Sequence, residues 1–120
     1  AAYNDFTFND YKTKRTERRN LERIAENISN AVIDISKILL SASEFDRNMP
    51  ETYREIILKL GEENIIPFNL TEQLTNIARI RNILAHQYLD IKWDYLKKFA
   101  DTYSKDVEKL VEIVDNFINL

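Results

Sequence analysis

Apolar residues recur every three or four positions over most of the chain, which is the spacing of one face of an α-helix. The clearest run lies between residues 16 and 43, and its stripe consists of Leu21, Ile24, Ile28, Val32, Ile35, Leu39 and Ala42. This nearly heptad-like pattern predicts one long amphipathic helix. Before it, Tyr3, Phe6 and Phe8 follow no helical period, so we expect an irregular aromatic lead-in.

Three further helices are predicted downstream. The segment "PETYREIILKLGEEN" is expected to begin with Pro50 in its first turn and to end near Gly61. The segment "LTEQLTNIARIRNILAHQYL" resumes the helical period, with Asn69 or Thr71 as its N-cap. Asp90 is expected to cap a last helix. The stripe of that helix comprises Leu96, Phe99, Tyr103, Val107, Leu110, Val114 and Phe117.

Four helices joined by short loops predict an all-α fold, an antiparallel helical bundle. The length of 120 residues suits a single domain over residues 1–120, and one glycine with two prolines suits a protein with few tight turns. The chain has no cysteine and therefore no disulfide, thiolate metal site or cysteine nucleophile. A single glycine cannot form a glycine-rich phosphate loop. A single histidine leaves only carboxylates as further metal ligands, so we expect no metal site.

The sequence shows no targeting or membrane segment. No apolar run approaches the roughly 20 residues of a membrane span, and the N-terminus lacks the apolar core of a signal peptide. We therefore expect a soluble, cytoplasmic protein with no membrane partner. The chain opens "AAYND" without a methionine, so the natural chain could extend further upstream.

Charge is unevenly distributed along a chain whose net charge is −3. Between residues 12 and 23 the basic residues are Lys12, Lys14, Arg15, Arg18, Arg19 and Arg23, against two acidic ones. Such a run fits contact with a phosphate backbone or an acidic partner, and it equally fits a solvated helix face. The acidic whole chain argues against strong non-specific nucleic-acid binding.

The segment "RNILAHQY", residues 81–88, places polar groups in an unusual position. On a helical wheel Arg81 falls in the apolar stripe that also holds Tyr88, and a buried guanidinium must be paired or must line a cleft. His86 shares a face with Asn82 but stands roughly 140° around from Arg81. Arg81 and His86 therefore meet at one ligand only through long side chains, an irregular helix end, or a second subunit.

These residues resemble the signature of the HepT-like toxins in the HEPN superfamily of helical ribonucleases: Arg, four residues, His, one residue, Tyr. The resemblance covers about residues 15–118 and includes "NAVIDISKILL" and "PETYRE". Two positions differ from the family pattern. Arg79 stands where a small residue is frequent, and Gln87 replaces a frequent acidic residue.

The resemblance implies a metal-independent ribonuclease without a cofactor, in which the 2′-hydroxyl of RNA attacks the adjacent phosphorus. His86 would transfer protons, Arg81 would hold the phosphate, and Asn82 would orient His86 or the phosphate. The active cleft would form at the interface of a two-fold homodimer. Transfer RNA and messenger RNA are both consistent substrates, and the expected contacts to the RNA backbone are Lys14, Arg15, Arg18, Arg19 and Arg79.

The resemblance further implies a toxin-antitoxin system. Its partner would be a small MntA-type nucleotidyltransferase, which transfers AMP to Tyr88 and so blocks the cleft by bulk and negative charge. Two alternatives remain: a non-catalytic helical module that binds the nucleotidyltransferase and serves as its substrate, and a structural bundle with a chance motif.

Overall fold

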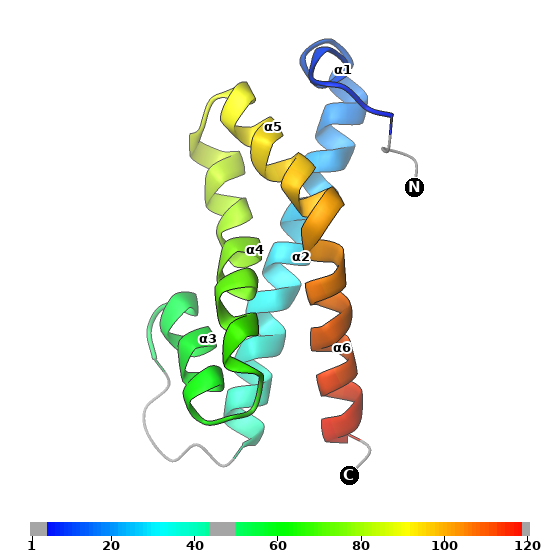
Figure 1. The fold of residues 1–120 in the computed structure, drawn as a ribbon. Helices are drawn as coiled ribbons and strands as arrows, with labels where there is room; N and C mark the ends of the chain where they lie inside the picture. The colour runs from blue at the N-terminus through cyan, green and yellow to red at the C-terminus, as the bar shows by residue number, and fades with distance from the viewer. Residues whose placement is uncertain (1–4, 44–49, 119–120) are drawn as a thin grey trace.

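In the computed structural model, which describes residues 5–43 and 50–118, helices and short connections account for the chain and no strand occurs in these ranges. In order the helices are α1 (Phe8–Thr13), α2 (Arg15–Ala42), α3 (Tyr53–Glu62), α4 (Phe68–His86), α5 (Leu89–Lys98), the π-helical turn η1 (Phe99–Tyr103) and α6 (Ser104–Ile118). The all-α prediction is confirmed. The bundle is elongated, 49 × 27 × 22 Å, with α2 running through its length beside the antiparallel α4 (Figure 1). No helix in the described ranges is both long and apolar enough to cross a membrane.

Small residues on the buried side of α2 let α4 approach closely. The buried positions of α2 are Ala25, Ser29, Val32, Ile33, Ser36, Leu39 and Leu40. Ser29 Oγ donates to the Ala78 carbonyl of α4 at 2.8 Å. The predicted stripe is wrong at two of its positions, since Ile24 is 46% exposed and Ala42 is also exposed. Hydrophobic periodicity treats serine as a solvated residue, whereas a serine whose hydroxyl bonds a carbonyl packs in the core.

Two clusters of buried side chains form the core. The larger one joins α2, α3, α4, η1 and α6 and includes the fully buried Leu40, Ile57, Leu60, Leu74, Ile77 and Leu110. The smaller one joins α1, the start of α2, α4 and α5 through Tyr11, Ala25, Ile80 and Leu96. Each large apolar side chain removed from water contributes roughly 1.5–3 kcal/mol. The larger cluster therefore fixes the first turns of α4, and the smaller one attaches α5 to the start of α2.

The starts of α3 and α4 differ from the predictions. Helix α3 starts at Tyr53, and its N-cap is Thr52, whose hydroxyl accepts from Glu55 N at 3.2 Å; Pro50 lies before the helix. Helix α4 starts at Phe68 after Pro67, two residues earlier than a cap at Asn69 and four earlier than a cap at Thr71 would place it. Threonine is a good N-cap only where its hydroxyl can accept from a free N–H. Thr71 instead donates to the Phe68 carbonyl at 2.6 Å from inside the helix.

The two ends of the chain are more structured than expected. The expected irregular lead-in contains α1, which Thr7 caps in a reciprocal pair with Asp10; Tyr3 lies outside the described residues. The single last helix expected after Asp90 is α5, η1 and α6 in succession, and α5 already begins at Leu89 with Tyr88 as its N-cap. The π-helical turn carries the buried Tyr103. Extra residues in a helical turn shift the helix face, and apolar periodicity alone did not resolve this shift.

Candidate active site

The chain turns a corner between α4 and α5, and the motif residues lie on either side of it. Helix α4 ends at His86, and Gln87 and Tyr88 are extended, with ψ angles of 165° and 163°. Tyr88 therefore does not continue the stripe of Arg81, and the helical-wheel prediction is wrong there. The irregular helix end considered as one way to complete the site is present.

Arg81 is exposed, although the wheel places it in the apolar stripe. Ile80 takes the buried position and packs in the smaller core cluster. The guanidinium of Arg81 is nevertheless held: Nη1 donates to Asn30 Oδ1 of α2 at 3.2 Å, and Cζ lies 6.0 Å from the centroid of the Tyr53 ring of α3. Arginine has five N–H donors in a planar fork, so these contacts orient the group and leave donors for a ligand.

Asn82 and His86 lie on the outer side of α4 and are exposed. Asn82 and His86 are four residues apart and share a face of α4. Arg81 points instead toward α2 and α3, where it contacts Asn30 and Tyr53. Among the residues that the structure describes, no hydrogen bond or ion pair joins His86 to another side chain. In one copy of the chain, therefore, Arg81 and His86 present two separate polar groups at the same end of α4.

The side chain of Tyr88 is 82% exposed at the corner. Asp90, the predicted cap, lies one residue inside α5, and its carboxylate accepts from Ile91 N at 2.9 Å. The Tyr88 side chain is thus open to solvent, two residues after His86. Within residues 5–43 and 50–118, no three His, Cys, Asp or Glu side chains gather in a way that could hold a metal ion.

The predicted basic run lies at the same end of the molecule as the α4–α5 corner, around α1 and the start of α2 (Figure 1). Part of it has local partners. Lys14 Nζ lies 3.4 Å from Asp10 Oδ1, and the cap bonds from Thr7 together with Lys14 lower the pKa of the Asp10 carboxyl. Arg18 lies over the Tyr11 ring, 6.0 Å from its centroid, while Arg15 and Arg19 are exposed.

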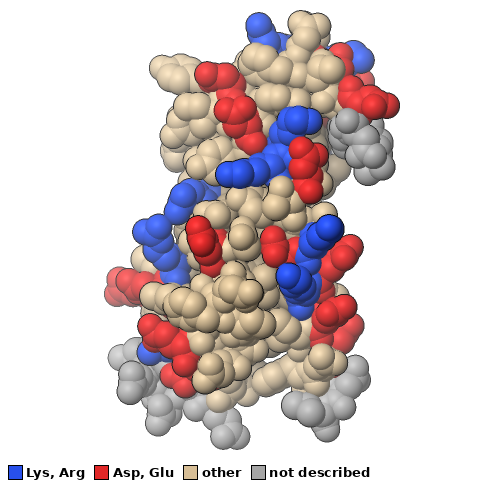
Figure 2. All heavy atoms as spheres, viewed as in Figure 1, with Lys and Arg blue, Asp and Glu red and all other residues tan. Residues whose placement is uncertain are grey.

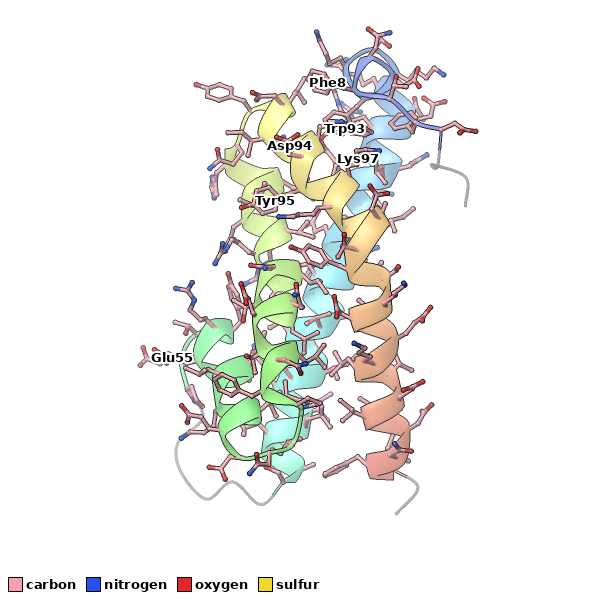
Figure 3. All side chains as sticks on the ribbon, viewed as in Figure 1. Phe8, Glu55, Trp93, Asp94, Tyr95 and Lys97 are labelled. Carbon is pink, nitrogen blue, oxygen red and sulfur yellow. The ribbon has the colours of Figure 1, made fainter. Side chains whose placement is uncertain are left out.

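An aromatic cluster that the sequence did not predict holds α5 in place. The Trp93 ring lies 6.1 Å from that of Phe6, 6.4 Å from that of Phe8 and 5.5 Å from that of Tyr11, between centroids. Figure 3 shows Trp93 and Phe8 at this junction. Tyr11 is fully buried and donates its hydroxyl to Glu22, and burial and this carboxylate raise the Tyr11 pKa. Tyr11 is therefore neutral at physiological pH, and the junction fixes α5, the helix whose N-cap is Tyr88.

Sequence reasoning also missed Asn30 and Tyr53, the two side chains that orient Arg81. Tyr53 lies in the segment "PETYRE", whose order relative to the motif is a usable signal. Asn30 had no such signal in the sequence, because an asparagine on a long amphipathic helix is ordinarily solvated. The remaining predicted residue, Arg79, is half-buried and lines a groove between α3 and α4.

The fold and site define an all-α bundle in which one helix ends in exposed arginine, asparagine and histidine side chains. A family model described as "Ribonuclease HepT-like" matches residues 1–115, and the chain belongs to this family. An mRNA nuclease HepT from Shewanella oneidensis is 24% identical over 95 residues, which cover 79% of this chain and 67% of that protein. A tRNA nuclease HepT from Aphanizomenon flos-aquae is 28% identical over 89 residues, which cover 74% of this chain and 59% of that protein.

The matched segment thus spans about two thirds or less of the length of these relatives. No solved structure matches the chain. The family prediction made from the motif is confirmed, and the roles of individual residues remain predictions.

Proposed function

We propose that this protein is a toxin ribonuclease that cleaves RNA without a metal ion, at a site completed by a second copy of the chain. The observation that carries the proposal is the exposed end of α4. There Arg81, Asn82 and His86 face solvent, in a helix whose preceding turns bury Leu74, Ile77 and Ile80. The named relatives, an mRNA nuclease and a tRNA nuclease, support RNA as the substrate class.

The chemistry needs proton transfers and a site for the phosphate. The 2′-hydroxyl loses its proton to a base and attacks phosphorus, the bond to the 5′-oxygen breaks, and an acid protonates that oxygen. This leaves a cyclic phosphate and a 5′-hydroxyl. Histidine exchanges protons near neutral pH, and His86 has this role. Arg81 binds the phosphate and stabilises the charge that builds up on its oxygens.

A second copy solves a geometric problem of the single chain. Arg81 and His86 point to different sides of α4, and a two-fold interface there brings the Arg81 of one copy toward the partner's His86. His86 takes the proton of the 2′-hydroxyl as the base and returns it to the 5′-oxygen as the acid, so one intact pair of Arg81 and His86 suffices for cleavage. Asn82, on the same face as His86, orients the imidazole or the phosphate.

We further propose that AMP transfer to Tyr88 by an MntA-type nucleotidyltransferase silences the ribonuclease. The exposed hydroxyl at the corner after α4 supports this role. A nucleotide there adds bulk and negative charge next to His86, which repels the RNA phosphates. Intact mass after co-expression with such a nucleotidyltransferase should show one added AMP in the native chain and none in Tyr88→Phe. An unmodified native chain would refute the regulation.

Cleavage of pooled RNA by the purified protein in EDTA tests the ribonuclease proposal directly. We expect cleavage, with products that end in a cyclic phosphate. If purified protein leaves RNA intact while Tyr88 accepts AMP, the chain is a non-catalytic module that serves as a substrate of its partner. This second function also requires an exposed Tyr88, so it is the alternative that the cleavage experiment must exclude.

A further inference from the structure

A groove of about 410 Å³ lies between α3 and α4. It is lined by Arg54, Leu58, Thr71, Glu72, Thr75, Asn76 and Arg79. Figure 2 shows basic side chains on the left of the drawn face at mid-height, beside the upper end of α3 and the neighbouring part of α4. The lining contains two guanidinium groups and one carboxylate, so the groove is locally basic in a chain whose net charge is −3.

Among the described residues, the two arginines of the groove have no charged partner. Neither Arg54 nor Arg79 forms an ion pair or hydrogen bond with any residue in the described ranges. Arg79 is half-buried, and a partly desolvated guanidinium gains most from a bound anion. The Thr75 hydroxyl donates to the Thr71 carbonyl at 2.7 Å, which leaves the Asn76 amide as a further donor toward the groove.

The groove lies on the same face of α4 as Asn82 and His86 of the proposed active site. Arg79 and His86 are seven residues apart, nearly two turns, and Asn82 lies between them on the same side. At a rise of 1.5 Å per residue, Arg79 lies about 10 Å along the helix from His86. A nucleic-acid strand carries one phosphate per roughly 3.4 Å when stacked and spaces them more widely when extended. The separation therefore corresponds to two or three nucleotides.

We propose that this groove binds a backbone phosphate of single-stranded RNA, two or three nucleotides from the phosphate that is cleaved. Arg79 and Arg54 hold the phosphate oxygens by charge-assisted hydrogen bonds. Glu72 lies at the end of the groove that is distant from His86. The groove's position in the substrate path rests on the proposed function. Its affinity for RNA does not, because it depends only on the charges of the groove.

Binding to a non-cleaving protein tests the groove separately from catalysis. The probe is a fluorescently labelled single-stranded oligoribonucleotide of mixed sequence, and its anisotropy is titrated with the His86→Ala protein in EDTA. Arg79→Gln and Arg54→Gln, each added to His86→Ala, should weaken binding roughly tenfold, since each removes a charged hydrogen-bond donor. The slope of log affinity against log salt should become shallower by about 0.7 when the phosphate contact is lost.

Two matched variants distinguish the groove from a general charge effect. Lys105→Gln also removes one positive charge, from an exposed position on α6, and should leave binding unchanged. Glu72→Gln removes the carboxylate of the groove and should tighten binding about twofold. A gain in affinity cannot come from a folding defect, so this variant keeps the test decisive if an arginine variant is unstable.

A modified probe locates the phosphate. An uncharged methylphosphonate is placed singly at each linkage of an oligonucleotide whose cleavage position is mapped. The substitution two or three nucleotides from the cleaved bond should weaken binding to His86→Ala, and it should add no further loss when Arg79→Gln is also present.

Each outcome bears on one proposal. Unchanged RNA affinity in both arginine variants, or no RNA binding at all, overturns the groove proposal even if the native protein cleaves RNA. An acidic partner is then the better occupant of the groove. Weakened RNA binding in the arginine variants, together with no cleavage by the native protein, supports the groove and overturns the proposed function.

Discussion

The two parts of α4 differ in what covers them. From Leu70 to Ile80 the helix packs against α2, α3 and α6, and its apolar residues are buried. From Arg81 to His86 the same helix presents arginine, asparagine and histidine to solvent. Wheel positions predict the same stripe for both parts, so the difference comes from the neighbouring helices. We infer that the covered part stabilises the fold and the uncovered part performs the chemistry.

The largest expected effect separates chemistry from folding. His86→Ala should lower the rate of RNA cleavage by about 10²–10⁴-fold, the usual contribution of a general acid or base. Its melting temperature should match the native value, because the side chain is exposed and has no partner among the described residues. Gln87→Ala, an exposed neighbour, is the matched control and should retain full activity. Native activity in His86→Ala would remove this residue from the mechanism.

The opposite result is expected in the covered part of α4. Leu74 is fully buried, and Leu74→Ala should lower the free energy of unfolding by about 3 kcal/mol through lost burial and a cavity. Urea denaturation measures the change. Leu58→Ala on α3, where the side chain is 43% exposed, should cost less than about 1 kcal/mol. Equal losses in the two variants would contradict the burial of the α4 stripe.

The contact between α3 and α4 gives a smaller effect. A Cβ at Gly61 would lie 2.5 Å from Thr71 Cγ2 and 3.2 Å from Phe68 Cδ2. Gly61→Ala should therefore destabilise the protein by about 1–2 kcal/mol, as overpacking does. The double variant Gly61→Ala with Thr71→Ser, which removes the opposing methyl group, should recover part of the loss in urea denaturation. Stabilisation by Gly61→Ala alone would show that the helices are further apart.

The smallest effect concerns the hydrogen bond between α2 and α4. Ser29→Ala removes the donor to the Ala78 carbonyl and should cost about 1 kcal/mol in the free energy of unfolding. Ser41→Ala, at an exposed position of the same helix, should change it by less than about 0.5 kcal/mol. A larger loss in Ser41→Ala would reverse the assignment of the buried side of α2.

The sequence predicted helix positions well and helix contacts poorly. Periodicity placed the cores of α2, α3 and α4, because an amphipathic stripe has the same period wherever the helix packs. Periodicity predicted Arg81 rather than Ile80 in the core. A helical wheel does not show which neighbouring helices cover each position, for example where α3 begins. Periodicity also carried α4 through Tyr88, although two extended residues turn the chain there.

The candidate site was found by the order of residues, not by physical pattern. The Arg-x4-His-x-Tyr spacing indicated the family, and the match over residues 1–115 confirms it. The partners of Arg81 on α2 and α3 could not be predicted from the sequence. Contacts between residues 51 positions apart, such as Arg81 with Asn30, depend on how whole helices pack.

Mixing two inactive variants tests most directly whether the uncovered end of α4 forms one site across two copies. Arg81→Ala and His86→Ala homodimers are each expected to be inactive, and they are exchanged by mild denaturation and refolding together. Native mass spectrometry measures the fraction of mixed dimers. If the site takes arginine from one copy and histidine from the other, the mixed dimer holds one of each and regains RNA cleavage. Mixed dimers that form and remain inactive would contradict a site shared between copies.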